Sequence, residues 1–155
     1  MGSTADNERA AFRAFYEKEF TEQTRRAGLI VGSKTAAADV VQDAMIAIWQ
    51  RWGDLQDPGP YLNRCVLNGC KRTAQRTRTG ERALSLLPPR PNPDGQIDTM
   101  WDAVAQLPFD LRAPVVLRFY GQLSNKEIAH ALDWPEGSVG PRITQALRQL
   151  RKAVQ

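Results

Sequence analysis

The amino-acid sequence predicts an all-α fold of two small helical domains joined by a proline-rich linker. Apolar residues recur at helical spacing over most of the chain, and no stretch alternates polar and apolar residues as a strand would. The helical spacing is interrupted at "TGERALSLLPPRPNPDGQ", whose four prolines disfavour a helix and favour an extended chain. A chain of 155 residues can hold two small domains. We therefore expect one domain over 6–78, a linker over 79–96 and a second domain over 97–154.

Three helices are expected before the linker, over residues 6–31, 35–52 and 60–78. Gly32 follows the first, where glycine commonly ends a helix, and Pro60 opens the third, where its missing amide does no harm. Their inward faces are expected to be Phe12, Phe15, Tyr16 and Phe20 in the first helix, Val41, Ala44, Met45, Ile48 and Trp52 in the second, and Leu62, Cys65, Val66, Gly69 and Thr73 in the third.

Four more helices are expected after the linker. The first two are marked by Ile97, Met100, Trp101, Val104 and Leu107, and by Val115, Val116, Phe119 and Tyr120. The last two lie in "LSNKEIAHALDWPEGSVGPRITQALRQLRK", where Ser124 and Glu127 have the spacing of a capping box. Their apolar faces are Ile128, Ala129 and Leu132, and Val139, Ile143, Ala146, Leu147 and Leu150. Two helices joined in this way usually place the second one in the major groove of DNA.

The last helix is expected to begin late, with Ser138 as its N-cap. A helix begun at Pro135 would hold Pro141 in its second turn, where the missing amide costs ~3 kcal/mol. After an N-cap at Ser138, Pro141 becomes the third helical residue and lacks only an amide that needs no partner within the helix.

The third helix carries a polar face that a hydrophobic core does not explain. Its members are Arg64, Asn68, Lys71, Arg72, Gln75 and Arg76, which share one side of a helix. The four basic side chains would repel one another without a partner, and phosphate is the natural one. Asn68 can hydrogen-bond a base edge. Net charge of +6 over 61–90 and +4 over 111–155, separated by −4 over 91–110, indicates one polyanion contact in each domain, with solvated basic faces as the alternative.

The second helix has a different polar face. Asp39, Gln42, Asp43 and Gln50 lie opposite its core stripe, which by itself is compatible with simple exposure to solvent. Trp49 stands at the edge of this face, and a large aromatic residue in such a place is typical of a protein interface.

Other features argue against a metal site, a membrane segment and an enzyme. Cys65 and Cys70 form no C-x-x-C pair, and a single histidine, His130, cannot complete a zinc site, so two buried thiols in a reducing cytoplasm are expected. No apolar run approaches the roughly 18 residues of a membrane span, and the start has no secretory leader pattern. No nucleophile has a base nearby and no glycine-rich loop could cradle a phosphate, so neither catalysis nor a cofactor is expected.

In their order and spacing, these segments resemble the bacterial alternative sigma factors of the extracytoplasmic-function (ECF) group, actinobacterial type, over residues 8–78 and 98–153. "AAADVVQDAMIAIWQRW" resembles the A-x-D-L-V-Q-E-x-F-x-x-x-W segment of sigma region 2, which docks on the clamp of RNA polymerase in that family. The resemblance implies that the residues binding core polymerase are Asp39, Gln42, Asp43 and Trp49.

"PGPYLNRCVLNGCKR" resembles the family's W-L-x-x-I-x-x-N segment, which melts and captures the minus-ten element of a promoter. Tyr61 stands where the family usually has Trp, and Asn68 falls on the motif Asn. The residues implied in minus-ten binding are Tyr61, Arg64, Asn68, Lys71, Arg72, Gln75 and Arg76.

The second domain resembles sigma region 4, whose last helix reads the minus-thirty-five element. "LPFDLRAPVVLRFYGQLSNKEIAHAL" and "EGSVGPRITQALRQLR" follow the family pattern closely, but Gly140 and Pro141 replace its Lys-Ser, Gln145 replaces an Arg, and Asp133 replaces the turn glycine. With no long side chain at 139–141, recognition is expected to shift along the helix. The expected DNA contacts are Arg142, Thr144, Gln145 and Arg148, with Lys126 and Ser138 on phosphates.

The resemblance implies an alternative RNA polymerase sigma factor that binds core polymerase, recognises promoter DNA and promotes strand opening. It also implies an anti-sigma factor as a partner, a cytoplasmic location and a monomer when no partner is bound. Two alternatives stay open. One is a regulator that binds DNA alone, for which no dimer interface or receiver domain is evident in the sequence. The other is a sigma-like decoy that does not initiate transcription.

Overall fold

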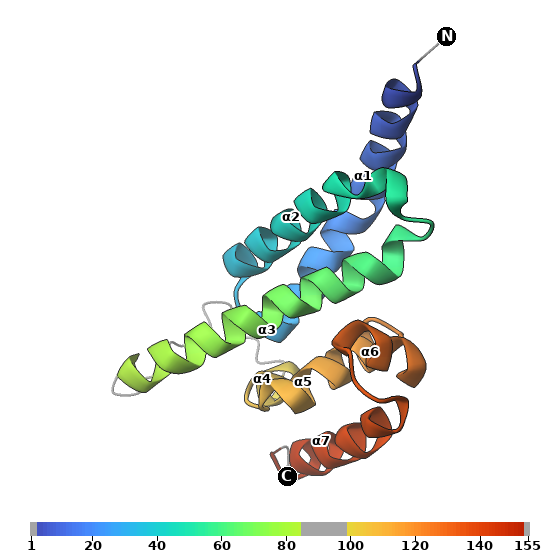
Figure 1. Ribbon diagram of the computed structural model, residues 1–155. Coiled ribbons are helices and arrows are strands. Elements are labelled where there is room, and N and C mark those ends of the chain that lie inside the picture. The colour runs from blue at the N-terminus through green and yellow to red at the C-terminus, as the bar shows by residue number, and fades with distance from the viewer. Residues whose placement is uncertain (1–2, 85–98, 154–155) are drawn as a thin grey trace.

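The computed structural model describes residues 3–84 and 99–153, and every regular element in these ranges is helical. Three long helices form the first domain and shorter ones lie beneath them as the second (Figure 1). The long helices are α1 (Thr4–Val31), α2 (Lys34–Gln50) and α3 (Pro58–Leu84); the shorter ones are α4 (Thr99–Ala105), α5 (Phe109–Val115), α6 (Asn125–Leu132) and α7 (Val139–Ala153). Three short helical turns join them, namely η1 (Trp52–Asp54), η2 (Val116–Tyr120) and η3 (Glu136–Ser138). The predicted all-α fold of two small domains is confirmed.

In the first domain, α1 ends where the sequence predicts, because Gly32 adopts a left-handed conformation with φ of 78°. Ser33 then caps α2 by accepting a hydrogen bond from the amide of Ala36. Helices α2 and α3 approach each other closely at Gly69, where a β-carbon would lie only 2.7 Å from Val40 Cγ1. The residues buried between the three helices are Ala27, Ile30, Ala37, Val41, Ala44, Met45, Ile48, Leu62, Val66, Leu67 and Cys70.

Helix α3 is longer than the sequence predicts. It continues to Leu84 instead of ending near residue 78, because the first proline comes only at Pro88 and the intervening residues are mostly good helix formers. The first part of the predicted linker, 79–84, is therefore helical. Residues 85–96, which include its prolines, and Ile97 lie outside the described residues.

The second domain is a helix-turn-helix, α6 and α7, supported by α4 and α5. Ser124 and Glu127 make the predicted capping box at the start of α6, since each side chain binds the other residue's backbone amide, at 3.1 Å in both directions. Three of the apolar residues expected to mark these helices' inner faces are exposed instead, and Met100 of α4 is one of them, at 46%. Leu147 is 40% exposed, because the residues of α7 that face inward are Val139, Ile143, Ala146 and Leu150. Phe119 is 54% exposed, because η2 is wound as a π-helix, so different residues of η2 point inward than in an α-helix.

The late start of the last helix is confirmed. Helix α7 begins at Val139, so Pro141 is its third residue, in the first turn. Ser138 is not confirmed as the N-cap, because it is the last residue of the η3 turn and its hydroxyl hydrogen-bonds backwards. The hydroxyl donates to the carbonyl of Pro135 at 2.7 Å and closes the η3 turn.

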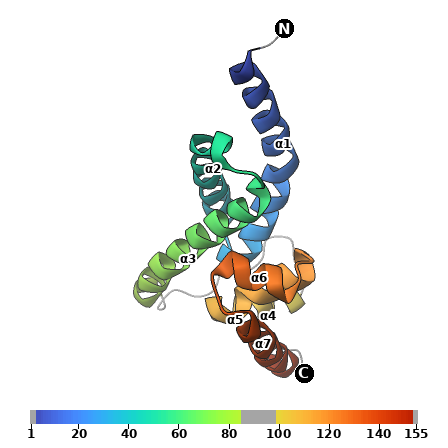
Figure 2. The ribbon, with the colours of Figure 1, turned by 45° about the vertical axis from the view of Figure 1, so that its right-hand side comes forward.

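The two domains lie against each other, with α6 packed on α3 and η2 on α1 (Figure 2). Beneath this contact, within the first domain, the amide oxygen of Asn63 on α3 accepts hydrogen bonds from Gln23 and Arg26 of α1, both at 2.7 Å. Arg26 is almost fully buried below Gly121, at which a β-carbon would come within 3.2 Å of its guanidinium. Burial lowers the pKa of Arg26, and the nearby Glu19 carboxylate acts in the opposite direction.

Candidate functional site

The polar face of α2 is free of the core. Asp39, Gln42 and Asp43 are all exposed, on the side of the helix away from Val41 and Met45. Gln42 is held from outside the helix, because the hydroxyl of Tyr16 on α1 donates to its Oε1 at 2.8 Å. Two carboxylates and an oriented amide therefore project side by side from this face.

Aromatic residues continue this face onto α1. The ring of Trp49 is 41% exposed and its centroid lies 5.0 Å from that of Phe12. Trp52, which the sequence assigned to the second helix, lies in η1 and meets Phe12 edge-on at 5.3 Å. Together with Tyr16 and the stems of Arg9 and Arg13, Phe12 and Trp49 line an open apolar groove of about 900 Å³. Exposed aromatic rings beside polar groups are typical of protein-binding surfaces.

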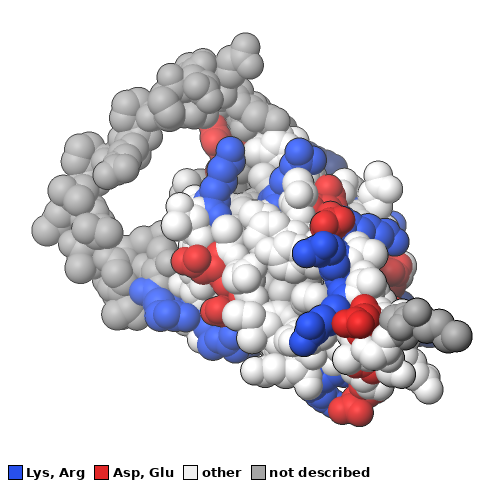
Figure 3. All heavy atoms as spheres, turned by 90° about the horizontal axis from the view of Figure 1, so that it is seen from above, with Lys and Arg blue, Asp and Glu red and all other residues white. Residues whose placement is uncertain are grey.

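On α3, the structure brings the predicted nucleic-acid face together on one side of the helix. The opposite side is buried through Leu62, Val66 and Cys70. Asn68, Lys71, Arg72, Gln75 and Arg76 are exposed, and Arg64 is partly buried. Seen from above, the surface of the molecule displays acidic and basic side chains interspersed (Figure 3).

Tyr61 stands one turn before this face and is fixed by Arg51. The guanidinium of Arg51 donates to the Tyr61 hydroxyl at 2.9 Å and lies 5.0 Å from the ring centre. A partly buried aromatic ring held in this way can offer a stacking surface to a base.

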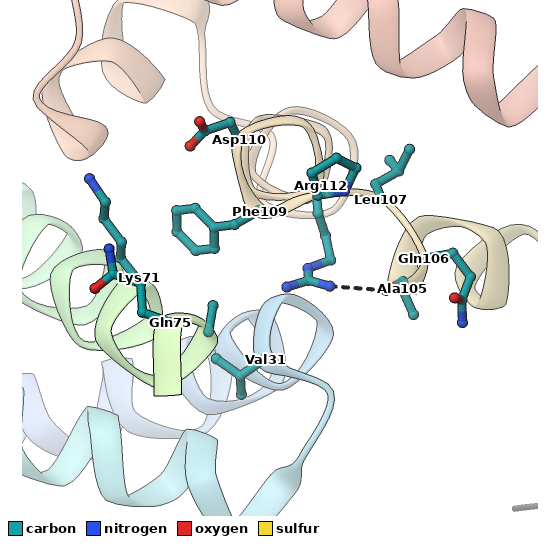
Figure 4. A pocket seen from close by; sticks show the side chains of 11 residues that line it. Val31, Lys71, Gln75, Ala105, Gln106, Leu107, Phe109, Asp110 and Arg112 are labelled. Atoms are coloured by element: carbon teal, nitrogen blue, oxygen red, sulfur yellow. Dashed lines mark hydrogen bonds between the residues drawn. The ribbon is translucent and has the colours of Figure 1, made fainter. Parts of the chain in front are cut away.

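The second domain borders part of the α3 face. The guanidinium of Arg64 pairs with the carboxylate of Asp133 at 2.8 Å. Further along the helix, Lys71 and Gln75 line a cavity of about 410 Å³ opposite Phe109 and Asp110 of α5 (Figure 4). The sequence did not predict any of these contacts between domains, because each partner has an unremarkable place in its own helix or turn.

The helix-turn-helix places most of its predicted DNA-binding residues on the surface. Lys126 at the start of α6 and Thr144, Gln145 and Arg148 on α7 are exposed, whereas Ser138 and Arg142 are partly buried. Arg142 has two neighbours outside α7. Its guanidinium carbon lies 4.4 Å from the centre of the Trp134 ring, and its NH1 lies 3.6 Å from Oδ2 of Asp110.

The thiols are not arranged for metal binding or catalysis. Cys70 is buried, and burial raises its pKa to about 12; Cys65 is half-buried, and burial raises its pKa as well. Among residues 3–84 and 99–153, no three His, Cys, Asp or Glu side chains are grouped to hold a metal ion. None of the helices in these ranges is long and apolar enough to cross a membrane.

Two helical domains, one with a basic helix face and the other with a helix-turn-helix, define a class of DNA-binding proteins. The chain matches the Sigma-70 region 2 family over residues 23–79 and the family of Sigma-70, region 4 over residues 97–150. It is 30% identical to the ECF RNA polymerase sigma factor SigL of Mycobacterium tuberculosis, over all of this chain and 95% of that protein. It is 29% identical to the RNA polymerase sigma-E factor of Streptomyces avermitilis, over 84% of this chain and 78% of the relative.

Solved structures share the fold. One is the sigma factor RpoE in complex with the anti-sigma factor NepR from Bartonella quintana, with a TM-score of 0.70, 16% identity, and coverage of 93% of this chain and 96% of that one. Another is CnrH in complex with the cytosolic domain of CnrY, with a TM-score of 0.70, 22% identity, and coverage of 94% and 88%. The chain belongs to the ECF RNA polymerase sigma factors, as its motifs predicted, and is an alternative sigma factor of the kind found in actinobacteria. Sigma factors are transcription initiation factors and have no catalytic role of their own.

Proposed function

We propose that three separate faces of this sigma factor divide the work of initiation. The α2 face binds core RNA polymerase, the α3 face binds the minus-ten element, and α7 with the start of α6 binds the minus-thirty-five element. The observation that carries the proposal is that most side chains of each face are polar and exposed, whereas Tyr61, Arg64, Ser138 and Arg142 are partly buried. The two domains are proposed to span 6–78 and 97–154.

For core polymerase, the proposed contacts are Asp39, Gln42, Asp43 and Trp49. The two carboxylates would attract a basic partner surface, and Trp49 offers exposed apolar area beside them. Because Tyr16 already orients Gln42, little conformational freedom has to be lost at this position on binding.

For the minus-ten element, the proposed contacts are Tyr61, Arg64, Asn68, Lys71, Arg72, Gln75 and Arg76. The basic side chains would neutralise phosphates, while Asn68, exposed among them, would hydrogen-bond a base of the opened strand. Tyr61 would stack against a base, which is the usual contact of aromatic residues with single strands.

For the minus-thirty-five element, the proposed base contacts are Arg142, Thr144, Gln145 and Arg148, and the proposed phosphate contacts are Lys126 and Ser138. The late start of α7 supports this assignment, since its first turn, Val139 to Pro141, presents no long polar side chain. Reading then begins at Arg142.

An anti-sigma factor is a further proposed partner. RpoE, whose fold resembles this one, has been solved with the anti-sigma factor NepR bound, and CnrH with the cytosolic domain of CnrY. We place the protein in the cytoplasm, where core polymerase and promoters are found, and expect a monomer in the absence of partners.

Run-off transcription with purified core polymerase tests the proposal directly. A template library of promoter fragments should yield specific transcripts only when the protein is added. A chain that binds core polymerase without producing transcripts would be a decoy, and a chain that binds DNA alone and produces no transcripts with core polymerase would be an independent regulator. Either result would reject initiation as the function.

A further inference from the structure

Arg142 is the first long side chain of α7, and residues outside that helix hold it. The centre of the Trp134 ring lies 4.4 Å from its guanidinium carbon, and the Asp110 carboxylate lies 3.6 Å from its NH1. Its side chain is 39% exposed, so one edge still faces solvent. The direction of this arginine is therefore set before DNA arrives.

Trp134 is itself fixed by the turn that carries it. The backbone of Asp133 is in the left-handed conformation, with φ of 58°. The amide of Trp134 donates to the carbonyl of Ala129 at 2.8 Å, which is the 6→1 hydrogen bond of a Schellman motif at the end of α6. Pro135 follows directly and restricts the backbone of Trp134. On the far side, the Ser138 hydroxyl closes the turn on the Pro135 carbonyl. The ring thus stands on a backbone that is tied at both ends.

The two contacts of Arg142 differ in what they leave available. A ring under the flat face of a guanidinium does not occupy its N–H groups, which point outward in the plane. The Asp110 carboxylate, in contrast, is an ion-pair partner on the N–H side of the guanidinium, 3.6 Å from NH1, and so competes with a phosphate or a base. Because Asp110 is 60% exposed and 3.6 Å away, its pairing with Arg142 is weak enough for DNA to replace.

We infer that Trp134 is a positioning residue for promoter recognition: it holds Arg142 toward one base pair of the minus-thirty-five element, and Asp110 is the partner that DNA displaces. The inference rests on the proposed role of α7. It also explains how the reading helix can work without long side chains in its first turn, since a single fixed arginine loses less conformational entropy on binding than a free one.

The test is selection by holoenzyme from a promoter library randomised across the minus-thirty-five element, with the preference scored at each position. Arg142→Ala should abolish the preference at one position. Trp134→Leu should weaken it at that same position, by roughly three- to tenfold, and leave the other positions unchanged. Trp134→Phe, which keeps an aromatic face, should restore part of it. Asp110→Asn should raise affinity for all library members.

Trp101→Leu is the matched control, because Trp101 is also partly buried in this domain but packs edge-on against Tyr120 at 6.1 Å. If Arg142→Ala leaves every position unchanged, the reading role of α7 is wrong. The positioning role of Trp134 is rejected if Arg142→Ala changes the base preference at a position but Trp134→Leu does not. It is also rejected if Trp134→Leu lowers the preference equally at all positions and lowers the melting temperature as well. Should Trp134→Leu fail to fold, Trp134→Phe against Trp134→Met decides by the same criterion.

Discussion

The guanidinium of Arg64 on α3 and the carboxylate of Asp133 in the turn after α6 form an ion pair of 2.8 Å between the two domains. Asp133 adopts a left-handed conformation that glycine would adopt at lower cost, with φ of 58°. The side chains are 39% and 80% exposed, so the pair is screened and worth little more than a weak surface contact. A phosphate can therefore take the place of Asp133 when α3 meets DNA.

Removing the charge at Asp133 should reveal this weak coupling. A double-mutant cycle of Arg64→Ala and Asp133→Asn should give a coupling free energy of ~0.2–1 kcal/mol in urea unfolding at low salt. The coupling should vanish near 1 M salt, where the screening length is about 3 Å. Asparagine tolerates the left-handed backbone, so the substitution removes charge without changing the turn. Glu136→Gln, in the neighbouring turn, is the control. If Arg64→Ala showed the same coupling free energy with Glu136→Gln as with Asp133→Asn, Asp133 would not be the specific partner of Arg64.

Loss of the α2 face should weaken holoenzyme formation. Asp39→Ala combined with Gln42→Ala removes two exposed side chains that the core does not use, so helical circular dichroism should stay the same. Affinity for core polymerase should fall about tenfold or more if these are central contacts. Thr35→Ala, exposed on the same helix, should have no effect. Unchanged affinity of the double variant, measured by competition with labelled protein, would reject the α2 face as the binding surface.

Arg72→Ala should weaken DNA binding on all sequences alike. Arg72 is exposed on the basic face of α3, and a phosphate contact carries no sequence information. The slope of log affinity against log salt should fall by about one for holoenzyme on promoter DNA. Arg118→Ala removes another exposed charge from η2, outside the proposed faces, and should leave that slope as it is.

Asn68→Ala should instead impair strand opening more than initial binding. Asn68 is neutral and lies among phosphate-binding side chains, so its loss should cost a base contact formed only after the strands separate. Permanganate footprinting of unpaired thymines in the minus-ten region should show reduced reactivity at saturating holoenzyme. Normal reactivity in this variant would assign Asn68 to a merely solvated surface.

Local chemistry in the sequence was enough to predict most helix ends. The capping box at Ser124, the stop at Gly32 and the start of α7 after Ser138 each depend on residues within one turn of the helix end. The end of α3 was predicted too early, because the proline-rich stretch suggested a break from Thr79 onward, whereas the good helix formers Glu81 to Leu84 continue the helix.

Contacts between distant segments could not be predicted in the same way. Arg26 reads as an ordinary charged residue of an amphipathic helix, yet it is buried against Asn63 because the second domain covers it. Arg142 was predicted as a DNA contact, but its support by Trp134 depends on how the turn folds back. Such pairs involve no periodic pattern, so only the tertiary structure brings them to notice.

Position 140 opens toward α6. A β-carbon built on Gly140 would lie 3.8 Å from Nδ2 of Asn125, which is ordinary van der Waals contact, and Pro141 beside it is exposed. A β-carbon at position 140 can therefore be accommodated without moving the backbone. Serine at position 141 would also restore an amide that the Ser138 hydroxyl could cap in the usual direction.

The substitutions Gly140→Lys and Pro141→Ser restore the family residues. Together they should raise holoenzyme binding to a family-type minus-thirty-five element by roughly tenfold or more. A regained phosphate contact adds about one unit to the salt slope, and a regained base contact adds ~1–3 kcal/mol of discrimination. Anisotropy titrations on two promoters that differ only in this element measure both effects. Gly137→Lys adds the same charge at a position with open space around it, and controls for nonspecific attraction. If the double substitution changes neither affinity nor sequence preference, positions 140 and 141 do not face DNA, and a different face of α7 contacts the major groove.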